Sequence, residues 1–163
     1  MRILASTLLF FLLTATANAS GTKVYDSDIP GVAIAGDIFV AGAWTRQSPP
    51  GVDVGAAYMR IKNNGEKSDR LLSAEVMYAD EVEIHMMGMK DGVMSMSEVE
   101  DGLEIESGTA VVFEPGSYHL MVKGMTEGPM AGDIVTFMLE FEKAGLVNIL
   151  MPVAPIGAKG PQN

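Results

Sequence analysis

Short strand-like segments separated by turn residues recur along most of this chain, and this pattern constrains the fold more than any other feature. Apolar runs end at clusters such as Pro49–Pro50–Gly51 and Asn63–Asn64–Gly65. Strand signals at intervals of about 8–12 residues indicate an all-β sandwich or barrel. From residue 34 onward no long segment has the 3.6-residue period of an amphipathic helix, which argues against helical and α/β folds.

The ends of these runs predict the domain and its strands. We expect a single-domain β-sandwich over residues 34–153. Its expected strands are residues 39–45, 56–62, 70–76, 81–89, 109–113, 118–122, 133–141 and 146–153. Residues 20–33 are expected to form an irregular lead-in. Residues 158–163 are small, polar and contain Pro and Gly, so we expect residues 154–163 to form a disordered tail.

The first 19 residues predict export. Arg2, an apolar run at residues 8–13 and the A-x-A sequence Ala17–Asn18–Ala19 indicate a secretory signal peptide that is cleaved after Ala19. The apolar run is shorter than the roughly 20 residues that a membrane-spanning helix needs. We therefore expect no stable membrane insertion, and no lipoprotein-type anchor either, because no cysteine lies near the cleavage site.

Charge and cysteine content narrow the classes of function. The formal net charge is −10, which argues against a phosphate-binding surface and therefore against nucleic acid as a partner. The chain has no cysteine, which excludes disulfides, thiolate metal sites and a type 1 copper centre. Any metal site must be built from histidines, methionines and carboxylates.

Both histidines of the chain lie beside methionines. His119 is two residues before Met121, and His85 begins a segment with five methionines. These five are Met86, Met87, Met89, Met94 and Met96. Imidazole and thioether donors together suit Cu(I) better than zinc, iron or magnesium. Methionine is also a common core residue, so packing is the competing interpretation for each of them.

Strand geometry predicts which of these side chains share a face. If Asp91–Gly92 closes a two-residue hairpin turn, His85 lies opposite Glu98, and every second residue points to the same side. That face then carries His85, Met87, Met89, Met94, Met96 and Glu98. His119 and Met121 share a face of a later strand, so two imidazoles and two thioethers converge if the strands meet. His85, His119, Glu83 or Glu98 could supply a harder ligand set for Cu(II).

The spacing of these residues resembles that of the periplasmic copper chaperone family PCu(A)C. The family pattern is a histidine, ten residues, a methionine, about twenty-one residues and His-x-Met. Here ten residues separate His85 from Met96, and 22 residues separate Met96 from His119–Leu120–Met121. The resemblance spans residues 34–152 and includes residues 42–46, 55–58, 89–94 and 115–121.

The resemblance implies a cupredoxin-like (Ig-like) β-sandwich with one exposed Cu(I) site made of His85, Met96, His119 and Met121. It also implies a periplasmic carrier, expected to be a monomer, rather than an enzyme. Its recipients would be the copper centres of respiratory cytochrome oxidase, reached directly or through an assembly thiol protein. Some family members bind more copper through a tail rich in His and Met, which residues 154–163 lack.

Two other interpretations stay open at this point. An exported β-sandwich could use a methionine-rich surface to hold a protein partner, and His85 and His119 would then be replaceable without loss. A copper oxidase or reductase would instead need an open coordination position and a substrate pocket. Colour and an EPR signal after oxidation would favour the enzyme, whereas a colourless, EPR-silent copper form would favour the carrier.

Overall fold

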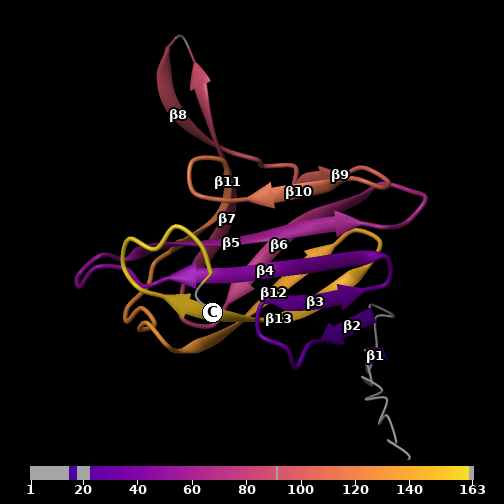
Figure 1. Cartoon of the computed structure of the whole chain (residues 1–163), viewed down its shortest axis with the longest axis horizontal. Coiled ribbons are helices and arrows are strands. Elements are labelled where there is room, and N and C mark those ends of the chain that lie inside the picture. Colours follow the sequence, from indigo (N-terminus) through magenta and orange to yellow (C-terminus); the bar gives the residue numbers. More distant parts are fainter. Residues whose placement is uncertain (1–14, 18–22, 91, 162–163) are drawn as a thin grey trace, which may run out of the picture.

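The computed structural model describes residues 15–17, 23–90 and 92–161. All regular elements among them are β-strands (Figure 1), and none of these residues forms a helix with the length and hydrophobicity that a membrane crossing requires. The predicted cleavage site after Ala19 lies outside the described residues. The strands are β1 (Ala15–Ala17), β2 (Lys23–Asp26), β3 (Val32–Ala35), β4 (Ile38–Arg46), β5 (Val54–Asn63), β6 (Asp69–Val76), β7 (Glu81–Lys90), β8 (Val93–Glu98), β9 (Leu103–Ile105), β10 (Ala110–Phe113), β11 (Tyr118–Lys123), β12 (Ile134–Phe141) and β13 (Gly145–Ala154).

The strands form two layers that share one core. One layer contains β2, β13, β12, β6 and β9, and the other contains β3, β4, β5, β10, β11, β7 and β8. Strand β13 joins them: residues 145–152 pair with β12, whereas Val153 and Ala154 pair in parallel with β4. The predicted all-β fold is therefore confirmed for the described residues.

The core between the layers is made by the alternate side chains of the strands. Phe137, Leu139 and Phe141 of β12 pack there with Ile149 and Met151 of β13, and all five are almost completely buried. Burial of each side chain of this size stabilises the fold by about 1.5–3 kcal/mol. Because every second side chain over residues 137–141 of β12 is buried, one face of the strand packs against the opposite layer, and this fixes the orientation of the strand.

All eight expected strands are present, as β4, β5, β6, β7, β10, β11, β12 and β13. The prediction of an irregular lead-in is wrong, because residues 20–33 contain β2 and the start of β3. Strand β2 pairs in parallel with β13, with Val24 opposite Leu146. The short strand β9 was also not expected. A parallel partner so distant in sequence leaves no local pattern from which β2 could be predicted.

The C-terminal segment packs on the domain, so the prediction of a disordered tail is wrong for its described part, residues 154–161. Ala154 ends β13, and its carbonyl oxygen accepts a hydrogen bond from the Gln47 N–H at 2.9 Å. Ala158 packs against a small cluster formed by Trp44 and Tyr58. Burial of small apolar groups against these rings orders a segment whose composition suggests a loop.

A β-bulge in β4 places that cluster outside the main core. The register between β4 and β5 shifts between Ala41 and Trp44, and Gly42 within the shift has a φ of 61°, which favours glycine. Trp44 and Tyr58 then pack with ring centroids 4.7 Å apart. The Arg46 guanidinium lies over both rings, at 5.6 and 5.4 Å from their centroids.

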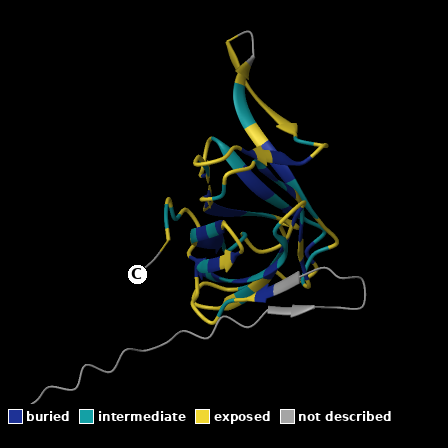
Figure 2. Ribbon diagram, turned by 90° about the vertical axis from the view of Figure 1, so that its right-hand side faces the viewer, coloured by how far each residue is buried: buried dark blue, intermediate teal, exposed yellow. Residues whose placement is uncertain are grey.

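The β7–β8 hairpin projects from the body of the domain and is largely exposed (Figure 2). Its register confirms the sequence prediction. The observed cross-strand pairs include His85–Glu98, Met87–Met96, Met89–Met94 and Lys90–Val93. Gly92 in the turn has a φ of 78°, as a tight hairpin turn requires. Four methionines and His85 therefore share one face of the hairpin.

Candidate metal centre

The two histidines meet across neighbouring strands. Strand β11 pairs antiparallel with β7, and His119 lies directly opposite His85. Their ring centroids are 5.7 Å apart with planes inclined at 64°. Each residue is only 8% exposed, so the rings form a nearly buried pair at the base of the projecting hairpin.

Met121 and Met96 lie on either side of this pair. Met121 is two residues beyond His119 on the same face of β11, and Met96 is the diagonal neighbour of His85 across the hairpin. Met96, His119 and Met121 line one cavity of about 380 Å³, with Arg46 and Ile156 also in its wall. The structure thus brings three of the four expected ligands to one cavity and places the fourth, His85, against His119.

A network of charges fixes the orientation of the His85 ring. Its Nε2 is 2.7 Å from Glu83 Oε2, and the Lys123 ammonium donates hydrogen bonds to Glu83 and to Glu81, the latter at 2.9 Å. The Lys123 hydrogen bond is the main cause that lowers the pKa of Glu83 below its ordinary value. An ionised carboxylate can only accept, so Nε2 of His85 carries the proton.

The other nitrogen of His85 is free to bind a metal. Nδ1 is buried and has no hydrogen-bond partner among the described residues. Since Nε2 holds the proton of the neutral ring, Nδ1 holds the lone pair. Histidines that bind metals usually donate the N–H of their other ring nitrogen to a carboxylate, which fixes the tautomer of the ring. His85 and Glu83 have this arrangement.

His119 presents its opposite nitrogen. Its Nδ1 donates a hydrogen bond to the Ser117 carbonyl oxygen at 3.2 Å, which leaves the lone pair on Nε2. Burial is the main cause that lowers the pKa of His119, the Ser117 hydrogen bond partly opposes it, and the nearby His85 lowers the pKa further. The neutral ring, which is the form that binds metals, is therefore favoured.

Glu83, His85 and Glu98 form an acidic group beside the histidine pair, with candidate ligand atoms all within 4.8 Å of one another. Glu83 is already bonded to the Lys123 ammonium, which neutralises it. A hard cation would have to compete with that ammonium for the same carboxylate. The geometry therefore favours a supporting role for Glu83 over the role of Cu(II) ligand that the sequence left open.

Two residues near the centre were missed from the sequence. Lys123 is two residues beyond Met121, so strand alternation could have placed it on the ligand face. Arg46 lies in the cavity wall beside Trp44, but the bulge in β4 makes its direction unpredictable from alternation alone. Its Nε is buried without a hydrogen-bond partner among the described residues.

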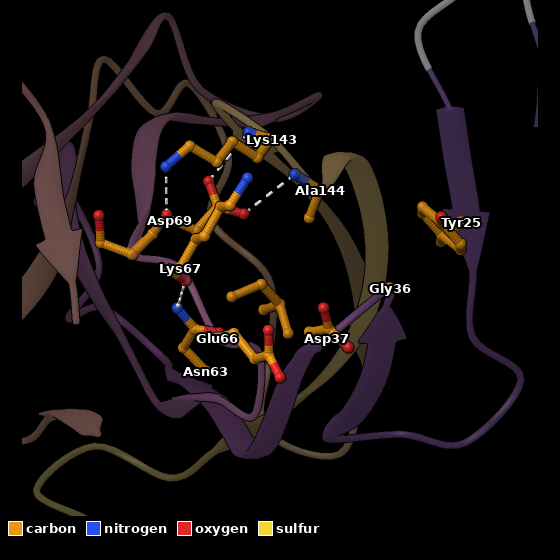
Figure 3. Close-up of a pocket in the computed structure, with 11 residues that line it drawn as sticks. Tyr25, Gly36, Asp37, Asn63, Glu66, Lys67, Asp69, Lys143 and Ala144 are labelled. Atoms are coloured by element: carbon orange, nitrogen blue, oxygen red, sulfur yellow. Dashed lines mark hydrogen bonds between the residues drawn. The ribbon is translucent and has the colours of Figure 1, made fainter. Parts of the chain in front are cut away.

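A larger cavity of about 490 Å³ lies at the opposite ends of β4 and β5 (Figure 3). Two of its polar side chains, Asn63 and Asp69, are hydrogen-bonded to the backbone of neighbouring segments. Asn63 donates to the carbonyl oxygens of Lys67 and Ile105, at 2.8 and 3.0 Å, and Asp69 accepts from the backbone N–H groups of Lys143 and Ala144, both at 2.9 Å. These contacts give Asn63 and Asp69 structural roles at this end of the domain.

Comparison with known proteins places the chain in a family. Residues 38–153 match the family described as "LpqE-like: Putative lipoprotein LpqE-like". The chain belongs to this LpqE-like family. It is also similar to "Putative lipoprotein Lxx21020" of Leifsonia xyli subsp. xyli (strain CTCB07), with 24% identity over 152 residues, which cover 93% of this chain and 90% of that protein.

Solved structures share the fold. The "Copper-bound PCuAC domain from PmoF2" aligns with a TM-score of 0.66 and 23% identity, covering 76% of this chain and 97% of that domain. The solution structure of CuI-DR1885 from Deinococcus radiodurans aligns with a TM-score of 0.51 and 22% identity, covering 69% and 75%. These likenesses confirm the predicted cupredoxin-like fold. They also confirm that the chain resembles PCu(A)C domains in its fold.

Proposed function

We propose that this chain is a periplasmic copper chaperone that binds one Cu(I) through His85, Met96, His119 and Met121. The observation that carries the proposal is the pair of opposed, nearly buried imidazoles, each with one hydrogen-bonded nitrogen and one nitrogen that holds a free lone pair. Two thioethers flank this pair, and two structures with the same fold are described as copper-bound and as a CuI form.

The chemistry of the donors favours Cu(I) over other ions. Two imidazole nitrogens and two thioether sulfurs are neutral and soft or borderline, and no thiolate is present. Thioethers need no deprotonation, so only the histidines make binding depend on pH. Zinc prefers cysteine, histidine and carboxylate ligands, and Glu83 is occupied by Lys123.

The position of the site supports a carrier rather than an enzyme. Met96 is 49% exposed on the projecting hairpin, so a recipient could reach at least one ligand without unfolding of the domain. Two thioethers stabilise Cu(I), and this disfavours redox cycling. As the PCu(A)C resemblance implies, the recipients would be the copper centres of respiratory cytochrome oxidase or their assembly factors.

The exported location is part of the same proposal. The N-terminal segment has the features of a signal peptide, and the relatives are described as lipoproteins, a class of exported proteins. Because the chain has no cysteine, the soft ligands of a metal site must be groups other than thiolates. The methionine thioethers are such groups.

An anaerobic Cu(I) titration against a competing chromophoric chelator tests this function. The protein should bind one tight equivalent, and the M96L/M121L variant should lose it. The matched control is M77L/M130L, which replaces two exposed methionines outside the site and should keep the tight equivalent. Tight binding that is indifferent to M96L/M121L would show that these two thioethers are not ligands.

The second candidate function is a protein-binding module. It is favoured by Met89, Met94 and Met96, which are 49–67% exposed on a projecting hairpin, since exposed methionines make adaptable interfaces. The H85A/H119A variant separates the two functions. A chaperone loses copper binding in this variant, whereas a module that only binds proteins has no tight copper equivalent to lose.

A further inference from the structure

The hairpin carries more thioethers than the proposed copper site uses. Its outer methionines, defined as Met87, Met89 and Met94, share one face with Met96. Met89 lies directly opposite Met94, and Met87 lies directly opposite Met96. The four sulfur-containing side chains thus form two successive cross-strand pairs that extend from His85 towards the turn.

These side chains have little protein to pack against. Met89 is 67% exposed and Met94 is 53% exposed, whereas Met59 and Met151 in the core are 2% and 0% exposed. Strand β8 is exposed along its whole length. Apolar side chains gathered on a projecting element mark an interaction site more often than single exposed residues do. Packing therefore does not account for Met89 and Met94, whereas Met87, nearer the domain, is half-buried.

We propose that the outer methionines form a second, weaker Cu(I) site, from which the ion passes to and from the inner site through Met96. This inference rests on the proposed function of the inner site. Each step of the passage forms one Cu–S or Cu–N bond as another breaks, and the oxidation state of copper does not change. The ligands stay neutral throughout, so no proton is taken up or released by the thioethers.

Strand geometry allows the outer methionines to share an ion. Directly opposite residues have Cβ atoms about 4.5–5.5 Å apart, and residues two apart on one strand are separated by about 6.8 Å. The three flexible bonds of methionine let the sulfurs of Met89, Met94 and Met87 converge within these distances. Met96, a proposed ligand of the inner site, lies directly opposite Met87 of the outer site, which makes it the point of exchange.

The donor set also predicts how the two sites differ. The outer site has thioethers only, so its affinity should be lower than that of a site with two imidazoles. The inner site should therefore fill first and the outer site second. The stoichiometry of binding distinguishes the two sites in one protein.

The test is a titration of the protein, labelled with ¹³C in its methionine methyl groups, followed by NMR. Ag(I) is the probe because it resembles Cu(I) as a soft ion and is stable in air, and anaerobic Cu(I) repeats the measurement. The first equivalent should shift the methyl signals of Met96 and Met121, and the second should shift those of Met87, Met89 and Met94. The M89L/M94L variant should lose the second step and keep the first.

Four outcomes decide between the proposals. Retention of the second step in M89L/M94L, or a second equivalent that leaves the hairpin methyl signals unchanged, overturns the outer site. Loss of the second step in the M77L/M130L control overturns it as well, because those residues lie elsewhere. If the methyl signals of Met87, Met89 and Met94 shift but that of Met121 never does, the outer site stands and the proposed inner site fails.

Discussion

The methionines of the core and those of the hairpin show how one residue type takes two roles. Met59 and Met151 are buried between the two layers, where they fill space. Met89 and Met94 have the same chemistry but lie exposed on a projecting hairpin. Since the side chains are identical, burial decides whether the thioether is a packing group or an available ligand. Substitutions in the two regions should therefore affect different properties.

The largest effect is expected from the core. Replacement Met151→Ala should lower the free energy of unfolding by about 2–5 kcal/mol, because it removes a fully buried side chain and leaves a cavity. Replacement Met94→Ala should change it by no more than about 0.5 kcal/mol. Urea unfolding of the copper-free proteins measures both. Equal losses in the two variants would mean that the hairpin methionines also pack, and the comparison would fail.

The next effect concerns the ligands. Replacement Met121→Leu should weaken Cu(I) binding by at least about 100-fold, more than the 10–100-fold typical of residues that only support a ligand. The copper-free protein should lose less than about 1.5 kcal/mol of stability, since leucine conserves most of the volume. Chelator competition and urea unfolding give the two numbers. Unchanged Cu(I) affinity would mean that Met121 is a packing residue and not a ligand.

A smaller effect is expected from the carboxylate behind His85. Replacement Glu83→Gln should weaken Cu(I) binding by about 10–100-fold, because an amide can present its NH2 group as well as its oxygen to Nε2 and so no longer fixes the proton of His85 there. Glu81→Gln is the matched control, since Glu81 also pairs with Lys123 but is not hydrogen-bonded to His85. Equal losses of Cu(I) affinity in both variants would mean that the effect arises from the lost contact with Lys123 and not from the tautomer of His85.

The smallest effect is the pH dependence of the copper-free protein. Burial lowers the pKa of His119 from the ordinary 6.5, so the unfolded chain takes up this proton at a higher pH than the folded chain does. The resulting stability is fully present above pH 6.5 and is lost as the pH falls through the folded-state pKa. Urea unfolding at several pH values measures it, and His119→Gln should flatten this part of the profile.

Sequence patterns predicted the hairpin better than the ends of the domain. The Asp91–Gly92 turn and the period of two are local features, so they predict the pairing of His85 with Glu98 without any tertiary contact. Strand β2 and the packing of Ala158 depend on partners far away in the sequence. Local composition does not depend on such distant partners. For this reason the composition of both ends predicts irregular structure.

The residue types and their alternation establish the kinds of donor, two imidazoles and many thioethers without a thiolate, and the strand faces on which they lie. The meeting of His119 with His85 follows from the pairing of β11 with β7 in the folded domain. The same pairing brings Lys123 and Glu83 to the His85 ring, where they leave Nδ1 as its free nitrogen. The physical reason is that strand alternation acts over neighbouring residues, whereas the pairing of distant strands depends on how the two layers bury their common core.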